Sequence, residues 1–135
     1  MSEPQAIPLP AAIREWLVAY VEQAWPEPAA VVAALPEALP AGEVRRLASG
    51  GPFGLMLAGR LDEVDGRLAL EALENSRMSG EVYFRVWDDG GREALEPAPR
   101  TGYTYKDEEE RPAAEAEYLA HNRAAYEHLR RRGFM

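Results

Sequence analysis

The chain has 135 residues, a net charge of −8 and no cysteine, and 47% of its residues are hydrophobic. This length and composition fit one folded domain with a single apolar core. The lack of cysteine excludes disulfides, cysteine nucleophiles and thiolate metal sites. The acidic balance disfavours nucleic acid as a partner, because phosphate binding needs a basic surface.

We expect a cytoplasmic protein with no membrane association. The N-terminus has neither the basic start nor the apolar stretch of a signal peptide. The longest strictly apolar run, residues 29–35, is far shorter than the roughly 20 residues of a membrane span. Lys106 is the one lysine beside many arginines. Together with abundant Ala, Leu and Pro, this bias is typical of a GC-rich bacterial genome.

The first part of the chain predicts a loose tail over residues 1–8, followed by helices. From Leu9 onward, apolar residues recur at the spacing of one helical face. This stripe consists of Leu9, Ile13, Trp16, Leu17, Tyr20, Val21 and Ala24. Pro26 and Pro28 end it, and Pro28 suits the first turn of a short second helix through Ala34. Residues 43–48 fit either a helical turn or a first strand, and we favour the helix.

The middle of the chain changes from helical spacing to alternation, which predicts β-strands. A first run alternates with Phe53, Leu55 and Leu57 on one side, and Asp65-Gly66 predicts a hairpin turn into the second run. A third run has one face of Val82, Phe84 and Val86, and an opposite face of Tyr83, Arg85 and Trp87. A turn at residues 88–91 follows. We predict an antiparallel meander of three or four strands with one buried face.

The end of the chain predicts an extended arm or long loop over residues 96–110 and then a long helix. Pro112 belongs in the first turn of this helix, and the three arginines 130–132 complement the dipole of its last turn. Gly133 suits a left-handed cap that brings Phe134 onto Leu129. The expected apolar face consists of Tyr118, Leu119, Ala125, Tyr126 and Leu129.

Together these elements predict an α+β fold in a single domain spanning residues 1–135. It has an N-terminal helix plus one short helix, a central antiparallel meander, and a long C-terminal helix packed on the sheet. We expect the helices at both ends to cover the same apolar sheet face, because this is the common solution for such chains.

One candidate site is a small-ligand pocket between the C-terminal helix and the sheet. Ser76, Arg77 and Ser79 lie between two predicted strands and suit an anion or carboxylate, although an ordinary turn uses the same residue types. Asn122 lies at the centre of the apolar stripe and therefore needs hydrogen-bond partners, from backbone or from a ligand. His121 beside it is able to move a proton near neutral pH. In this hypothesis Arg77 holds an anionic group that Asn122 orients.

A second candidate site is a surface for a protein partner. Tyr103 and Tyr105 alternate along the arm, so in an extended chain both rings face the same side. They pack either on their own domain or on a partner. Tyr83 and Trp87 lie on the sheet face opposite the expected core, where we expect them to be exposed.

Catalytic and cofactor motifs do not emerge from the sequence. His121 and His128 are seven residues apart, which is not the spacing of two metal ligands on one helix, and no nucleotide-binding glycine loop or nucleophilic serine motif occurs. We expect no metal and no cofactor. We favour a non-enzymatic protein-binding or accessory protein, with a protein partner or as a homodimer, that acts through an exposed sheet face and the aromatic arm. The alternative is a binder of a small anionic metabolite, or a small enzyme, that uses the pocket.

Overall fold

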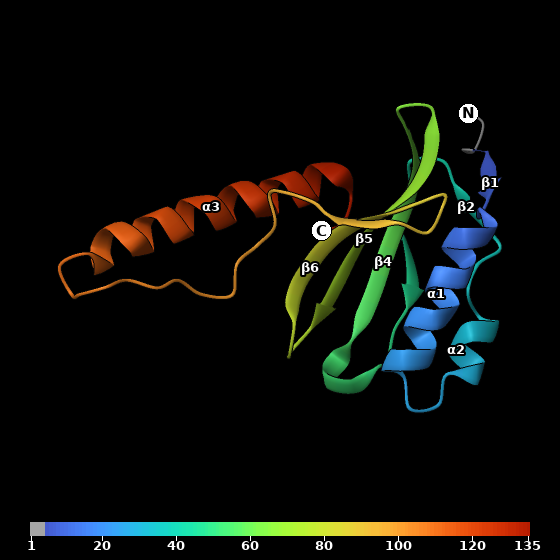
Figure 1. Cartoon of the computed structure of the whole chain (residues 1–135), viewed down its shortest axis with the longest axis horizontal. Helices are drawn as coiled ribbons and strands as arrows, with labels where there is room; N and C mark the ends of the chain where they lie inside the picture. The colour runs from blue at the N-terminus through green and yellow to red at the C-terminus, as the bar shows by residue number, and fades with distance from the viewer. Residues whose placement is uncertain (1–4) are drawn as a thin grey trace.

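The computed structural model describes residues 5–135 and has an α+β fold (Figure 1). Its main sheet is an antiparallel meander of five strands in chain order, which are β3 (Arg45–Ala48), β4 (Met56–Val64), β5 (Arg67–Ser76), β6 (Gly80–Trp87) and β7 (Arg92–Ala94). Helices α1 (Ala11–Ala24) and α2 (Ala29–Ala33) precede the sheet, and α3 (Arg111–Arg132) follows it. The predicted fold class is confirmed, with five strands in place of three or four.

Within the described residues, three short segments form strands that the local sequence did not predict. Ala6–Pro8 form β1, which pairs with β2 (Ala38–Pro40), so this part of the expected loose tail is ordered; residues 1–4 lie outside the described range. Arg45–Ala48 form β3 and not the helix that we favoured. Each of these strands forms against an edge that another strand supplies: β1 and β2 pair with each other, and β3 pairs with β4. Leu47 and Ala48 of β3 belong to the buried core. Tertiary pairing therefore overrides local preference here.

The predicted hairpin between β4 and β5 is confirmed. Val64 pairs with Arg67 across a two-residue turn, in which Asp65 and Gly66 both have positive φ angles of 52° and 76°. This conformation is the type I′ turn that matches the twist of two antiparallel strands. The strand before the turn begins later than expected, because Phe53 lies in a single helical turn with φ of 57° and is 55% exposed.

The main core lies between α1 and one face of the sheet. Ile13, Leu17 and Val21 are fully buried on α1. They belong to one cluster with strand residues that include Leu57, Leu61, Leu70, Phe84 and Val86. Gly59 lies within this layer, and a Cβ there would come 2.8 Å from Leu70 Cδ1 and 2.9 Å from Leu47 Cδ1. A side chain at this point would therefore force the two leucine side chains to shift.

The expectation that both terminal helices cover the same face is wrong. The last turns of α3 lie on the opposite face, where Leu129 packs against Leu73 and Tyr83. The reason is that β5 and β6 carry apolar side chains on both faces, so each face needs its own cover. The predicted end of α3 is confirmed: Gly133 has φ of 93°, and the N–H of Phe134 donates to the carbonyl of Leu129.

Only the C-terminal end of α3 contacts the sheet, and the rest of the helix projects away from it (Figure 1). Ala125 and Leu129 are the buried residues of this 22-residue helix. Leu119, which we expected on the buried face, is 53% exposed. The segment between β7 and α3 has no helix or strand and runs beside the projecting part. No helix within residues 5–135 combines the length and apolarity needed to cross a membrane.

Candidate functional site

A buried ionic cluster attaches the end of α3 to the sheet. Its centre is Glu71 on β5, which is 4% exposed. The Arg132 guanidinium lies 2.6 Å from one Glu71 oxygen and 2.9 Å from an oxygen of Asp62 on β4. The Tyr83 hydroxyl donates to the other Glu71 oxygen at 2.7 Å. A carboxylate loses its hydration when it is buried, which costs on the order of several kcal/mol unless other groups pair with it. The arginine and the tyrosine provide that pairing here.

Arg60 and His128 complete the cluster. The Arg60 guanidinium pairs with Asp62 and also donates to the backbone carbonyl of Arg132 at 2.8 Å. The His128 ring nitrogen Nε2 lies 3.0 Å from the Tyr83 hydroxyl. Burial and the hydrogen bond to Glu71 raise the pKa of Tyr83 above its usual value. The polar groups of the cluster satisfy one another and hold the end of α3 on the sheet. We call this cluster the anchor; it consists of Arg60, Asp62, Glu71, Tyr83, His128 and Arg132.

Tyr83 therefore does not have the exposed position that we expected. It is 4% exposed, and its ring makes edge-on contacts with His128 and Phe134. The sequence placed Tyr83 on the correct sheet face, but α3 and its cap cover that part of the face. Trp87, on the same face, is partly buried beneath two guanidinium groups, those of Arg67 at 4.7 Å and Arg85 at 5.2 Å from the ring centroid.

Asn122 and His121 bind the backbone at the start of the arm. Asn122 accepts from the N–H of Arg100 at 2.8 Å and donates to its carbonyl at 2.9 Å. The His121 ring nitrogen Nε2 lies 2.7 Å from the carbonyl oxygen of Ala98. The sequence left two kinds of hydrogen-bond partner open for Asn122, backbone and a ligand. In the structure its partner is the backbone of the loop at Arg100. We call these three hydrogen bonds the clamp, because they fix residues 98–100 against α3.

The turn between β5 and β6 satisfies its own polar groups. The hydroxyls of Ser76 and Ser79 lie 2.7 Å apart, and the N–H groups of Met78 and Ser79 donate to Ser76 Oγ. The side chain of Arg77 is exposed. Within the described residues, no hydrogen bond or ion pair joins this turn to Asn122 or His121. The structure thus places the two halves of the predicted pocket in separate hydrogen-bond networks.

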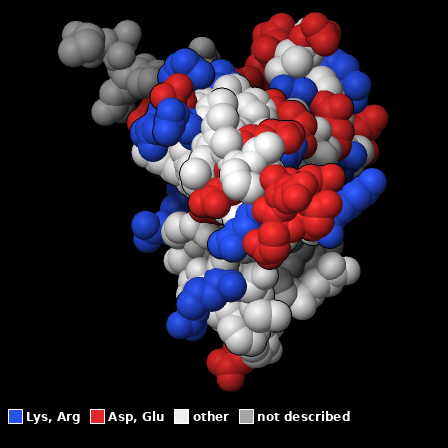
Figure 2. Space-filling model, turned by 90° about the vertical axis from the view of Figure 1, so that its left-hand side faces the viewer, with Lys and Arg blue, Asp and Glu red and all other residues white. Residues whose placement is uncertain are grey.

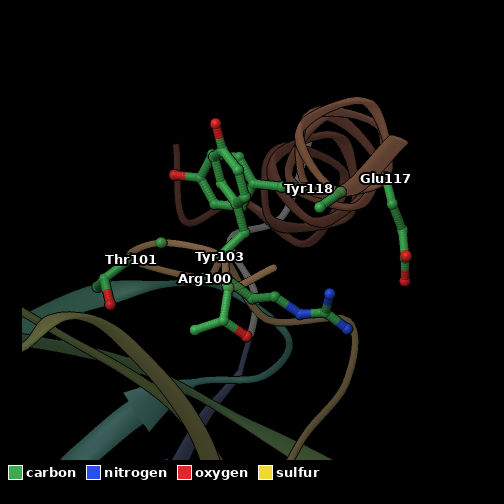
Figure 3. Close-up of a pocket in the computed structure, with 8 residues that line it drawn as sticks. Arg100, Thr101, Tyr103, Glu117 and Tyr118 are labelled. Atoms are coloured by element: carbon green, nitrogen blue, oxygen red, sulfur yellow. The ribbon is translucent and has the colours of Figure 1, made fainter. Parts of the chain in front are cut away.

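A groove of about 560 Å³ lies between the arm and α3. Its lining includes Arg100, Thr101 and Tyr103 from the arm, and Glu117 and Tyr118 from the helix. The rings of Tyr103 and Tyr118 have centroids 5.2 Å apart, and Tyr105 lies 6.1 Å from Tyr103. Figure 3 shows the two labelled rings together on one side, while the Arg100 and Glu117 side chains extend on the other. Of the two arm tyrosines, Tyr103 therefore packs on α3 of this domain, while Tyr105 beside it is 40% exposed.

Sequence reasoning missed both the anchor and most of the groove. The signal for the anchor was Glu71 itself, a single charge within the apolar run Leu68–Leu73. Arg100, Glu117 and Tyr118 had no such signal, because their meeting depends on the path of an irregular segment. Among residues 5–135, no three carboxylate or histidine side chains are grouped as a metal ion would require.

Comparison with known proteins adds no functional assignment. No protein family, no curated protein and no solved structure matches this chain.

Proposed function

We propose that this is a non-enzymatic protein-binding protein whose recognition surface is the projecting part of the molecule. We define this projecting surface as residues 100–124, the arm and the first part of α3. One observation carries the proposal: α3 has 22 residues but buries only Ala125 and Leu129. Helices in proteins gain most of their stability from packing an apolar face. A long helix held at one end is therefore suited to packing on something outside its own domain.

Exposed apolar groups on the projecting surface support this proposal. Leu119 is 53% exposed and Tyr105 is 40% exposed. Both belong to the same projecting part, and Tyr105 stands next to the tyrosine pair of the groove. Aromatic residues are enriched where proteins meet, because they bury a large area with little loss of side-chain freedom.

The charge of the projecting surface also supports a protein partner. Figure 2 views the molecule from the end at which α3 begins, and acidic side chains gather there. The exposed acids of this region are Asp107, Glu108, Glu109, Glu110, Glu115 and Glu117. The same residues 100–124 also include four cations, Arg100, Lys106, Arg111 and Arg123, so the surface carries both signs with a small excess of acids. Such a pattern of charges favours a partner with the complementary pattern.

Site-specific photocrosslinking in native lysate tests the proposal. A photoreactive phenylalanine analogue replaces Leu119, and the matched control carries it at Phe53, which has nearly the same exposure, 55% against 53%. We expect discrete adducts with a protein partner from position 119 and none from position 53. Equal adduct patterns from the two positions, or no adduct from position 119, would contradict the proposal.

A second candidate function is the binding of a small anionic metabolite, and one observation favours it. The Arg100 guanidinium lines the groove, and no ion pair engages it among residues 5–135. A groove of about 560 Å³ also lies within the size range of small-molecule sites. A carboxylate metabolite that raises the melting temperature of the wild-type protein, but not that of Arg100→Ala, would support this candidate. The same rise in both proteins would count against it.

A further inference from the structure

We infer that the outer face of α3 binds the same face of a second copy of this chain, with the two helices antiparallel. The outer face is the exposed side of the helix that lies away from the arm, and it comprises Pro112, Glu115, Ala116, Leu119, Ala120 and Arg123. This inference rests on the proposed function, because it identifies the partner of one part of the projecting surface. Two features of the face lead to it: its uncovered apolar centre and the order of the charges along the helix.

The outer face is the side of α3 that its own domain leaves uncovered. The arm and the sheet contact the other side of the helix, through Tyr118, Asn122 and Leu129. At the centre of the outer face, Leu119 is 53% exposed, and both Ala116 and Ala120 beside it are exposed as well. Small side chains next to a leucine let two helices approach closely while the leucine fills the space between them. The shape of the face therefore suits another helix.

The charges along α3 are ordered so that the helix complements itself when it is reversed. Glu115 lies four residues before Leu119, and Arg123 lies four residues after it. Glu108, in the turn before the helix, and Arg130 lie eleven residues on either side of Leu119. All four charged side chains are exposed. An antiparallel second copy, related by a twofold axis that passes beside Leu119, therefore places each of these acids opposite an arginine of the other copy.

Helical geometry brings these charges onto the side of Leu119. Four and eleven residues are close to one and three whole turns of about 3.6 residues each, so Glu115 and Arg123 lie on the same face as the leucine. Arg111 and Glu127, eight residues on either side, flank this face and also carry opposite signs. A parallel pair would place each charge beside its own copy, so that glutamate meets glutamate and arginine meets arginine. The order of the charges therefore selects the antiparallel pair.

Contacts within the domain compete little with this pairing. Among residues 5–135, no ion pair involves Glu115, Arg123 or Arg130, and Glu108 makes one exposed contact of 3.5 Å with Arg111. In a twofold dimer the same patch serves both copies, so every favourable opposition occurs twice. The chain thus carries on one helix both a surface for a partner and the pattern of charges that complements it.

Sedimentation velocity of the full-length protein over about 1 to 200 μM tests this inference. We expect a reversible monomer–dimer equilibrium within this range. Glu115→Arg and Arg123→Glu each place like charges opposite one another twice in the dimer, so each should weaken self-association by about tenfold or more. The double variant Glu115→Arg with Arg123→Glu should regain the wild-type affinity. An equal mixture of the two single variants should dimerise for the same reason, because opposite charges meet again between the two chains.

The matched control is Glu63→Arg on β4, because Glu63 is also exposed and the net charge changes by the same amount as in Glu115→Arg. This control should change the dimer affinity by less than about twofold. A wild-type protein that stays monomeric at about 200 μM would overturn the inference. A double variant that associates as weakly as the single variants would overturn it as well, since the charges would then not face one another.

Crosslinking at Leu119 separates the failure of this inference from the failure of the proposed function. If the wild type stays monomeric but position 119 gives an adduct with another protein, the projecting surface binds a partner and only the antiparallel pairing fails. If the wild type stays monomeric and position 119 gives no adduct, both proposals fail. An adduct with the mass of two copies of this chain, together with a dimer in sedimentation, supports both.

Discussion

Glu71 shows how one buried charge determines where a helix docks. Its side chain is 5% exposed, so its carboxylate has little access to water. Arg132 and Tyr83 replace the lost hydration with short hydrogen bonds. A different docking position for α3 would leave the buried carboxylate without its arginine partner, which would destabilise the folded state. The anchor therefore fixes the direction in which the rest of α3 projects.

Replacing Arg132 with leucine tests the anchor. We expect the free energy of unfolding to fall by about 2–3 kcal/mol, less than the ~3–5 kcal/mol of a fully buried pair because the Arg132 side chain is 33% exposed. Urea denaturation measures the change. The control is Arg131→Leu, whose exposed neighbour position should change stability by about 0.5 kcal/mol or less. Equal losses in the two variants would show that Glu71 does not need Arg132.

Replacing Asn122 with alanine tests the clamp. The variant loses the acceptor for the Arg100 N–H and the donor to its carbonyl. We expect the amide hydrogen of Arg100 to exchange with solvent about tenfold faster or more, because a lost hydrogen bond of about 1.4 kcal/mol gives that factor. Exchange within β5 should stay unchanged. An unaltered Arg100 exchange rate would mean that the arm is held in another way.

Tyr20 and Tyr83 should make stability fall at alkaline pH. Burial raises the pKa of Tyr20 and that of Tyr83 above the usual value of 10.0. Hydrogen bonds to a carboxylate, Glu74 for Tyr20 and Glu71 for Tyr83, raise both pKa values further. The folded state thus keeps protons that the unfolded chain releases, so this stabilisation is complete below about pH 10 and declines above it. Tyrosinate absorbance followed against pH should show a fraction that appears only with unfolding. That fraction should shrink in Tyr20→Phe and in Tyr83→Phe, and an unchanged fraction would contradict the assignment.

At the scale of elements, the sequence predicted what depends on near neighbours. Three predictions depend on residues that are close together in the sequence, and all three agree with the structure. They are the apolar stripe of α1, the Asp65-Gly66 turn and the Gly133 cap. The strand β3 depends on a partner edge, so its own residues did not predict it. The face that α3 covers was missed because alternation leaves apolar residues on both sides of β5. The groove was missed because no periodicity predicts the path of residues 96–110.

The cap of α3 gives a test at the same scale. Gly133 has φ of 93°, and a Cβ there would lie 3.3 Å from Val44 Cγ2. Gly133→Ala should therefore destabilise the protein by about 1 kcal/mol or slightly more, from backbone strain and crowding. The control is Gly102→Ala, where no atom lies within 4 Å of the added Cβ. Thermal unfolding compares the two variants, and a neutral Gly133→Ala would contradict the left-handed cap.

At the scale of the whole molecule, the protein combines a packed body with a projecting helix. The body consists of the sheet with α1 and α2, and its core contains most of the fully buried side chains. The projecting surface contributes little to that core, but it carries an exposed leucine, the arm tyrosines and a concentration of acids. This division supports our proposal that the body serves as a scaffold and the projecting surface as the part that meets a partner.

Scanning photocrosslinking in native lysate tests this central claim most directly. The photoreactive phenylalanine analogue replaces, one at a time, two exposed residues of the projecting surface, Tyr105 and Leu119, and two exposed residues of the body, Phe53 and Met78. We predict discrete adducts with a protein partner from the first two positions and none from the other two. Adducts from the body positions alone would contradict the claim and place the binding surface on the body of the protein.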